Sequence, residues 1–348
     1  MLKYIIRRLL LLPVIMLLVT LVLFFLMLRL PAEQRAELYM PAIGPNATPE
    51  RIARLLQRII EQRGLDKPLP VQYVSWLRNL VRGEWGFSPM WKQDVLAGIV
   101  QRAPASLELS LAAMIPASVL ALLLGPLAAR YRQRWPDQAI RLAASVGWAF
   151  PAFILALLLL NVFYAWLHWF PPERLSLWAQ TLAQSPSFHS YTGMYTVDAL
   201  LNGNLRLFLD ALIHLVLPAL TLGIAQWALM TRVLRASTLE VLHEDYITTA
   251  RAKGVPELRV LTAHATRNAV LPLISTAGVA VSLLISSSVL VELVYNFNGL
   301  GRAAAKAIAA GDVPVAVGFA LFTCAVTVVA SLIADVLYAV VDPRVRLY

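Results

Sequence analysis

Six long apolar runs constrain this chain more than any other feature of its sequence. They lie at about Leu9–Leu28, Leu107–Ala129, Leu142–Trp169, Leu212–Thr231, Val270–Tyr295 and Val315–Val341. A helix needs about 20 consecutive apolar residues to cross a hydrocarbon layer of about 30 Å, and each run reaches that length. None of the runs shows the alternation typical of strands in a membrane barrel. The sequence therefore predicts an all-α membrane protein with six transmembrane helices.

Composition agrees with this class and adds little about chemistry. The 348 residues are 59% hydrophobic and 14% charged, whereas a soluble domain of this length carries more charge. The first run has basic flanks like a signal peptide, but it is too long for one and no small-residue cleavage site follows it. The single cysteine, Cys324, lies in the sixth run and excludes an intrachain disulfide. The positions of the basic residues along the chain matter more than the net charge of +10, and we expect no nucleic-acid partner.

Lysine and arginine positions predict the orientation of the spans. Half of the 30 Lys and Arg residues fall on the side that holds both termini, and the two short opposite loops hold only four. Cytoplasmic loops are enriched in these residues, so we expect both termini in the cytoplasm of a cell-membrane protein. Eleven more lie at positions 29–102 on the outer side. A loop of that length is translocated largely regardless of its charge.

The long external loop, residues 31–103, contains helix signals of its own. Thr48 and Pro49 are typical of a helix start, an apolar stripe follows, and Gly64 is a stop signal. A second helical stretch is expected at Tyr73–Val81. The loop either packs as a cap on the outer mouth of the bundle or contacts substrate directly, and the sequence leaves both open.

The cytoplasmic segment between the fourth and fifth runs is the strongest functional signal. A first helix is expected from about Ser237 to Lys253, ended by Gly254, which takes a positive φ without steric cost. Pro256 then suits the first turn of a second helix. The slim, basic tip predicts a docking surface on which Arg251 and Lys253 pair with carboxylates of a partner. The alternative is a loop that binds anionic lipid headgroups.

This segment resembles the coupling loop of permease subunits in bacterial ATP-binding-cassette importers, more narrowly the dipeptide and oligopeptide subfamily, first-permease type. The subfamily pattern Y-x-x-T-A-R-A-K-G, then H-x-x-R-N-A-x-x-P, is matched at Tyr246, Thr249, Ala250, Arg251, Ala252, Lys253, Gly254, His264, Arg267, Asn268, Ala269 and Pro272. Further stretches resemble the subfamily in the same order along the chain, namely 4–9, 64–73, 104–109, 214–222, 299–302 and 342–346. Asn298 stands where the subfamily has proline, and the external loop 171–206 is longer than usual.

The resemblance implies a type I importer permease fold and a chain that acts together with other subunits. It assigns residues 1–30 to the cytoplasmic tip and first span, 31–103 to the external loop, 104–341 to a five-helix core with the coupling loop at 237–269, and 342–348 to a cytoplasmic tail. The chain would pair with a second homologous permease, two cytoplasmic ATPase subunits and an extracytoplasmic substrate-binding protein, within membrane lipid. The implied coupling residues are Thr248, Thr249, Ala250, Arg251, Ala252, Lys253, Gly254, Val255 and Pro256. No phosphate-binding GxxxxGK[ST] motif is present, so ATP hydrolysis would belong to the partners, and no cofactor or catalytic residue is expected.

Polar residues in or near the spans are candidates for the pathway. Glu108 and Glu292 lie near external ends, where they either contact substrate and gate the mouth or pair with Arg102 and Arg302. Ser282 and Ser286 face one way on the fifth span, where they either pack helices together or line the pathway. Further possible gate positions are Gly299 and Gly301. The scattered histidines predict no metal site.

Peptides are the substrates that the resemblance favours, and related permeases carry glycosides, opines or chelated nickel. An ATP-independent secondary transporter is the alternative class. Such a transporter would be expected to show inverted repeats or midplane charges, and the sequence has neither. An intramembrane enzyme would need a catalytic constellation within the spans, which is also missing.

Overall fold

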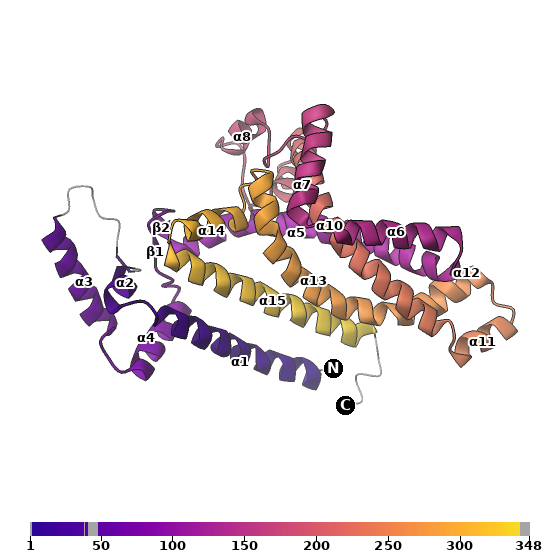
Figure 1. Cartoon of the computed structure of the whole chain (residues 1–348), viewed down its shortest axis with the longest axis horizontal. Helices are drawn as coiled ribbons and strands as arrows, with labels where there is room; N and C mark the ends of the chain where they lie inside the picture. The colour runs from indigo at the N-terminus through magenta and orange to yellow at the C-terminus, as the bar shows by residue number, and fades with distance from the viewer. Residues whose placement is uncertain (1, 38, 41–47, 342–348) are drawn as a thin grey trace. The chain divides into compact units, whose positions relative to one another are not determined.

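The computed structural model describes residues 2–37, 39–40 and 48–341. The described residues form helices joined by turns and loops, together with one small hairpin of two-residue strands (Figure 1). The elements, in chain order, are α1 (Leu2–Met27), α2 (Ala32–Glu37), α3 (Pro49–Arg63), α4 (Leu69–Val81), β1 (Phe87–Ser88), β2 (Gln93–Asp94), α5 (Val95–Arg130), α6 (Trp135–Ala149), α7 (Ala152–Leu160), the π-helical segment η1 (Asn161–Trp166), α8 (Leu177–Ala183), α9 (Tyr195–Leu201), α10 (Leu205–Val241), α11 (Asp245–Ala252), α12 (Glu257–Arg259), the π-helical segment η2 (Val260–Ala265), α13 (Thr266–Val294), α14 (Leu300–Ala309) and α15 (Val313–Val341). The predicted all-α membrane class is confirmed.

Four helical stretches are long and apolar enough to cross a membrane, and a bent helix pair raises the number to five. The four are α5, α10, α15 and the continuous stretch Glu257–Val294, which combines α12, η2 and α13. This count covers only the described part of the chain, in which the apolar part of α1, Leu12–Met27, is shorter than these four. The spans therefore extend beyond the apolar runs that predicted them: α5 begins at Val95 and α10 at Leu205.

The third predicted span, 142–169, is not one straight helix. Helices α6 and α7 meet at Phe150 and Pro151, and the pair Trp135–Ala149 and Ala152–Trp166 is bent by 100°. A residue before proline is pushed into extended backbone, and Phe150 has φ −85° and ψ 127°. Proline also removes the N–H that would continue the helical ladder. The bend therefore follows from Pro151.

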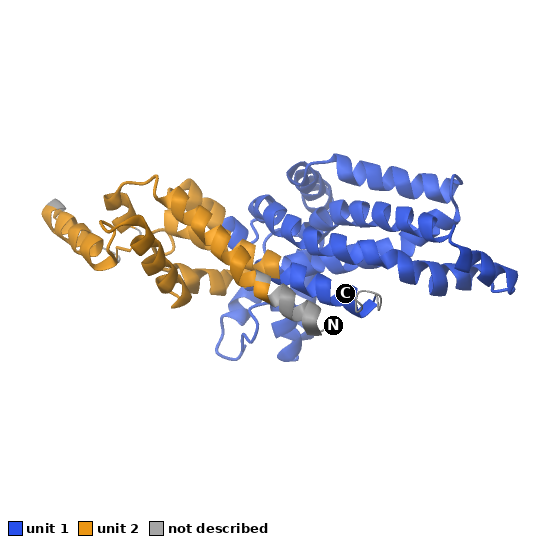
Figure 2. Ribbon diagram, turned by 90° about the horizontal axis from the view of Figure 1, so that it is seen from below, with its two compact units in different colours: residues 1–5, 104–302, 329–348 blue, residues 6–103, 303–328 orange. Residues whose placement is uncertain are grey.

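The chain divides into two compact units (Figure 2). Unit 1 comprises residues 1–5, 104–302 and 329–348, and unit 2 comprises residues 6–103 and 303–328. In unit 1 the long helix α10 packs against α6, α7, α9 and α13. At 1.5 Å per residue its 37 residues span about 55 Å, so it projects well beyond a hydrocarbon layer of about 30 Å. Helix α10 thus connects the segment that carries α8 and α9 to the segment that carries α11.

The core of unit 1 is built from small residues and aliphatic side chains on α5, α7, α10 and α13. One cluster includes Leu109, Leu217, Leu284 and Tyr295, all buried. The Tyr295 hydroxyl lies 3.0 Å from Thr221 Oγ1 and 3.2 Å from the Ala156 carbonyl oxygen. A buried hydroxyl at this depth is costly unless it is hydrogen-bonded, and these two contacts satisfy it.

Unit 2 contains the external-loop helices that the sequence predicted. Helix α3 begins at Pro49 after Thr48 and ends at Gly64, whose φ is +64°. Helix α4 begins at Leu69, earlier than the predicted Tyr73, with Pro70 in its first turn, where the missing N–H is not needed. Strands β1 and β2 pair antiparallel, and Ser88 Oγ donates a 2.6 Å hydrogen bond to Asp312 Oδ2.

Candidate coupling hairpin and external network

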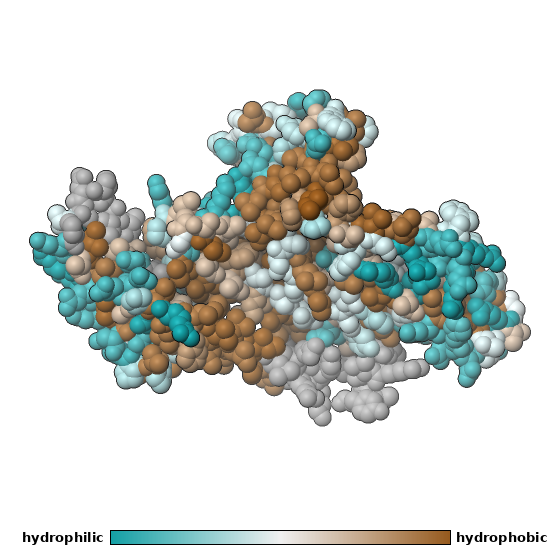
Figure 3. Space-filling view, viewed as in Figure 1, coloured by the Kyte–Doolittle hydropathy of each residue, from teal (hydrophilic) through white to brown (hydrophobic). Residues whose placement is uncertain are grey.

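Residues 245–265, called the coupling hairpin below, form a helical hairpin at one end of unit 1. Helix α11 is its first limb, and α12 with η2 is its second limb, which continues without interruption into α13. The surface at this end is largely hydrophilic (Figures 1 and 3). The predicted first helix, 237–253, is wrong: α10 ends at Val241 and a turn through Leu242, His243 and Glu244 precedes α11. Glu244 and Asp245 favour a new helix start there because acidic groups are stabilising near a helix N-terminus.

The hairpin has a small hydrophobic core of its own. Ile247 and Ala250 from the first limb pack with Val260 and Ala265 from the second, and all four are buried. The Tyr246 hydroxyl accepts a 2.7 Å hydrogen bond from Asn268 Nδ2 at the beginning of α13. Part of the sequence motif therefore holds the hairpin together rather than facing outward.

The turn between the limbs is closed by main-chain hydrogen bonds around Gly254. The Val255 N–H donates to the Ala250 carbonyl at 3.2 Å, and the Gly254 N–H donates to Arg251 at 2.9 Å. Gly254 has φ +72°, a conformation that L-residues rarely adopt, so the glycine stop that the sequence predicted is present. Pro256 precedes the second helix as its N-cap residue, and α12 begins at Glu257.

The predicted docking residues lie together on this hairpin. Most of them are exposed, Val255 is half-buried and Ala250 is buried. The exposed members are Thr248, Thr249, Arg251, Ala252, Lys253, Gly254 and Pro256. A Cβ added at Gly254 would have no atom of the chain within 4 Å. The tip is therefore slim and open to the approach of another molecule.

Arg251 is engaged within its own chain. Its Nε and NH2 groups donate to the two carboxylate oxygens of Glu257 at 3.2 and 2.8 Å, across the turn. Its hydrogen bonds to the Glu257 carboxylate raise the pKa of the Arg251 guanidinium, which stays charged throughout the ordinary pH range. The sequence assigned Arg251 a carboxylate of a partner subunit and did not consider Glu257.

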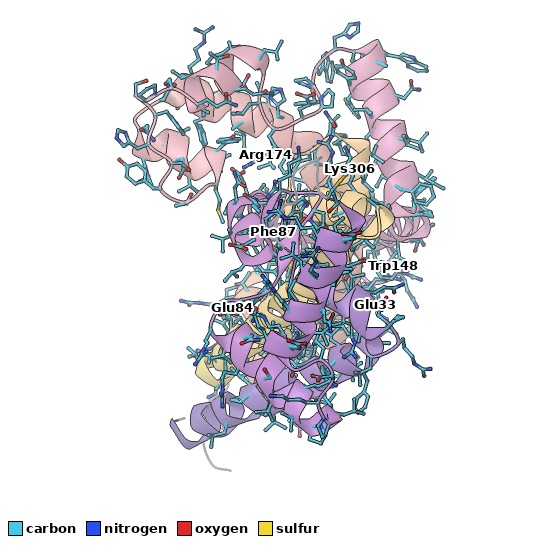
Figure 4. The ribbon with its side chains drawn as sticks, turned by 90° about the vertical axis from the view of Figure 1, so that its left-hand side faces the viewer. Glu33, Glu84, Phe87, Trp148, Arg174 and Lys306 are labelled. Carbon is cyan, nitrogen blue, oxygen red and sulfur yellow. The ribbon has the colours of Figure 1, made fainter. Side chains whose placement is uncertain are left out.

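A second polar network lies where the 171–204 segment, with α8 and α9, meets α5. Glu108 is 6% exposed and receives a 2.7 Å hydrogen bond from Arg174 and two more, each 2.7 Å, from the N–H and hydroxyl of Thr196. Arg174, labelled in Figure 4, lies over the Tyr195 ring, and its guanidinium carbon is 4.1 Å from the ring centroid. The predicted partner Arg102 is wrong, because Arg102 donates instead to the Gly98 carbonyl and to Gln101. No feature of the sequence indicated Arg174 as a partner, because it is 66 residues away from Glu108.

Glu292, at the other predicted gate position, is fully buried. Its carboxylate accepts hydrogen bonds from Ser106 Oγ at 2.5 Å and from the Arg302 N–H at 2.8 Å. The predicted pairing with the Arg302 guanidinium is wrong, because that group donates to the Asn296 carbonyl. A Cβ at Gly299 would lie 2.5 Å from Glu292 Oε2, and one at Gly301 would lie 3.1 Å from the same oxygen. Both glycines are thus required for close approach of the backbone to Glu292.

The two serines of the fifth span have different environments. Ser286 is exposed on α13 and donates to the Ser282 carbonyl at 3.1 Å, and Ser282 is half-buried. Ser286 is therefore exposed on this chain, with its hydroxyl hydrogen-bonded to the main chain of its own helix.

Helices α5 and α10 enclose a groove of about 280 Å³. Its walls are apolar and include Ala113, Pro116, Gly223 and Trp227. A site that selects a polar substrate needs placed polar groups to orient it, so this groove is not built for one. Among the described residues, no group of three or more His, Cys, Asp and Glu side chains could hold a metal ion.

Comparison with known proteins places the chain among transport proteins. The family model "Binding-protein-dependent transport system inner membrane component" matches residues 121–347, and the corresponding N-terminal model matches residues 1–110. The matched C-terminal region contains the coupling hairpin and α13. The terminal stretch 342–346, noted above for its resemblance, lies outside the described residues.

Individual relatives agree with these family models over most of their length. The chain is 38% identical over 292 residues to the protein "Probable D,D-dipeptide transport system permease protein" of Escherichia coli K12, with 84% of each chain covered. It is 36% identical to a di/tripeptide transport system permease protein of Pseudomonas aeruginosa, with 86% of each chain covered. It is 34% identical to a glutathione transport system permease protein of E. coli K12, with 99% of each chain covered. This chain therefore belongs to the family of inner membrane components of binding-protein-dependent transport systems.

Proposed function

We propose that this chain is one of two membrane subunits of an ATP-driven importer for dipeptides and oligopeptides. The relatives above are named for D,D-dipeptide, di/tripeptide and glutathione transport, and all three substrates are short peptides. The family description supplies the dependence on a binding protein. The further partners that we propose are a second homologous permease in the membrane and two ATPase subunits in the cytoplasm.

The observation that carries this proposal is the continuity of the coupling hairpin with a membrane span. The second limb and α13 form one helical stretch of 38 residues, Glu257–Val294. The hairpin is stiffened by its own core, so a displacement of its tip is passed to α13 instead of being absorbed by a flexible loop. Helix α13 in turn packs against α10 and α7. A pull on the tip by ATPase subunits would therefore shift a helix that carries Ser282 and Ser286.

We place both termini and the hairpin in the cytoplasm, and the α8–α9 segment outside. Helix α10 carries these two segments at its opposite ends, about 55 Å apart. On this placement Glu108 and Glu292 hold the external mouth together by hydrogen bonds within the chain, and the hydroxyl groups of α13 line the pathway. The division into residues 1–30, 31–103, 104–341 and 342–348 is retained as part of the proposal.

Replacement of Gly254 by aspartate tests the docking role. The substitution adds bulk and negative charge where the turn is open, so we expect peptide uptake to be lost while the amount of protein in the membrane is unchanged. Gly203→Asp is a matched control, because Gly203 also has a positive φ, +66°, and no atom within 4 Å of an added Cβ. Uptake should survive in the control. Normal uptake by Gly254→Asp would contradict docking at this turn.

A further inference from the structure

The two basic side chains beside Gly254 differ in what they contact. Arg251 holds Glu257 through two hydrogen bonds, 2.8 and 3.2 Å, that join the end of the first limb to the start of the second. The side chain of Lys253 has no ion-pair or hydrogen-bond partner among the residues that the structure describes, and it is exposed. Arg251 and Lys253 are only two positions apart in the sequence, and they differ in their contacts. The Arg251 guanidinium is ion-paired within the chain, whereas the Lys253 ammonium has no partner among the described residues.

The geometry explains why Arg251 is the one that is held. The main-chain bonds around Gly254 reverse the chain within a few residues and bring position 257 back beside position 251. A guanidinium is planar and presents parallel N–H groups to both oxygens of a carboxylate, which an ammonium cannot do. Glu257 also follows Pro256 in the first turn of α12, where a carboxylate is stabilised by the helix dipole. Both partners are thus fixed by the fold of the hairpin before any other molecule arrives.

Exposure limits what this ion pair contributes to folding. The side chains of Arg251 and Glu257 are 43% and 48% exposed, and exposed ion pairs add little to the stability of a protein. The ion pair acts instead on the charge and the shape of the surface at the tip of the hairpin. The pair neutralises Arg251 and joins the two limbs, so within residues 251–257 the unpaired positive charge is that of Lys253.

We infer that Arg251 is a positioning residue that clasps Glu257 within the coupling hairpin, and that Lys253 is the cation that meets a carboxylate of the ATPase subunits. This inference rests on the proposed function, since it assigns roles within the same docking surface. It differs from the simpler expectation in which Arg251 and Lys253 both pair with the partner. The two assignments predict opposite results when charges are exchanged within the chain.

A charge exchange between positions 251 and 257 tests the inference. The complete importer is purified from membranes with its partner subunits, carrying Arg251→Glu, Glu257→Arg or both substitutions together. Each single variant places two like charges across the turn, and we expect peptide-stimulated ATP hydrolysis to fall about fivefold, the effect of one exposed charge contact. The double variant restores the ion pair, so its activity should return to within about twofold of the unmodified protein.

Two further variants separate positioning from direct contact. Arg251→Lys keeps the charge but cannot donate in parallel to both oxygens of Glu257. We expect its stimulated ATP hydrolysis to lie between that of Arg251→Glu and that of the unmodified protein. Lys253→Glu should reduce the amount of ATPase subunit that copurifies with the chain, whereas Arg251→Glu should leave copurification unchanged and lower only the stimulated hydrolysis.

The outcomes distinguish this inference from the proposed function. A double variant as inactive as Arg251→Glu, or single variants as active as the unmodified protein, would overturn the assignment of Arg251 as a positioning residue paired with Glu257. Either result would leave the importer function intact. Failure of any ATPase subunit to copurify with the unmodified chain would overturn the proposed function and the inference with it.

Discussion

Glu108 and Glu292 each accept a hydrogen bond from a side chain that is distant in the sequence. Glu108 bonds to Arg174 and Thr196, and Glu292 bonds to Ser106 and the Arg302 N–H. The sequence identified both glutamates as unusual, because an acid near an apolar run is costly. Besides a role in contacting substrate or gating the mouth, it offered the nearest arginine along the chain as the partner of each glutamate, and in the fold that guanidinium bonds elsewhere. The unusual position of each glutamate could thus be predicted from an acidic residue next to an apolar run, whereas the groups that bond to it depended on tertiary packing.

The ion pair between Glu108 and Arg174 makes a prediction at this scale. Arg174→Met removes the counter-charge of a carboxylate that is 6% exposed, so the detergent-purified protein should lose about 3–5 kcal/mol of stability. In the double variant Arg174→Met/Glu108→Gln no charge is left unpaired, and at least half of that loss should be recovered. Thermal unfolding measures both variants. Equal losses in the single and double variants would show that the pair has no such role.

At the scale of the elements, the glycine stops were predicted correctly, whereas the bend at Pro151 was not. Gly64 and Gly254 end helices where the sequence predicted, each with a positive φ. Pro151 breaks the third run with a 100° bend, which the apolar run concealed. The turn after Val241 has neither glycine nor proline and was missed. Tertiary contacts within the hairpin core, such as Ile247 with Val260, favour this turn over a longer helix.

The segment that carries α8 and α9 is held by Asp198, and this predicts a pH dependence. Burial raises the pKa of the Asp198 carboxyl, but hydrogen bonds from Thr192, Ser190 and the Gly193 N–H outweigh it and hold the pKa below the ordinary 3.8. A carboxyl whose pKa is lower in the folded state stabilises that state fully above its unfolded pKa, and the contribution is lost as pH falls through the folded value.

Amide hydrogen exchange of residues 186–204 between pH 5 and pH 3 measures this dependence. After correction for the intrinsic exchange rate, protection should be constant above about pH 4 and fall below it. Asp198→Asn removes the titrating group, so the corrected protection in this variant should be lower by about 1–3 kcal/mol and no longer change with pH. A pH-dependent loss of the same size in Asp198→Asn would assign the effect to another group.

At the scale of the whole molecule, the account depends on which segments face which side of the membrane. We expect cysteines placed at Arg132 and Lys253 to react with an impermeant thiol reagent only from the cytoplasm, and a cysteine at Glu61 only from outside. All three positions are exposed on this chain, so burial within the chain would not explain a lack of labelling. A Cys324→Ala background removes the native thiol. Labelling of all three from one side would contradict the placement of the hairpin.

The class of the molecule could be predicted from sequence, and the contacts within the coupling hairpin could not. Apolar length gave the membrane fold, and the run from Tyr246 to Pro272 resembled a coupling loop before any helix was placed. The internal use of Arg251, Tyr246 and Asn268 became visible only in the folded hairpin. A motif records which residues are needed and does not distinguish those that bind a partner from those that hold the surface in shape.

The most direct measurement is isolation of the tagged chain from its own membranes in mild detergent, with mass spectrometry of the associated proteins and small molecules. We expect a second membrane permease, ATPase subunits, and a binding protein loaded with a short peptide. Isolation of the chain alone, together with ATP-independent uptake when it is reconstituted in liposomes, would contradict the account and indicate a secondary transporter.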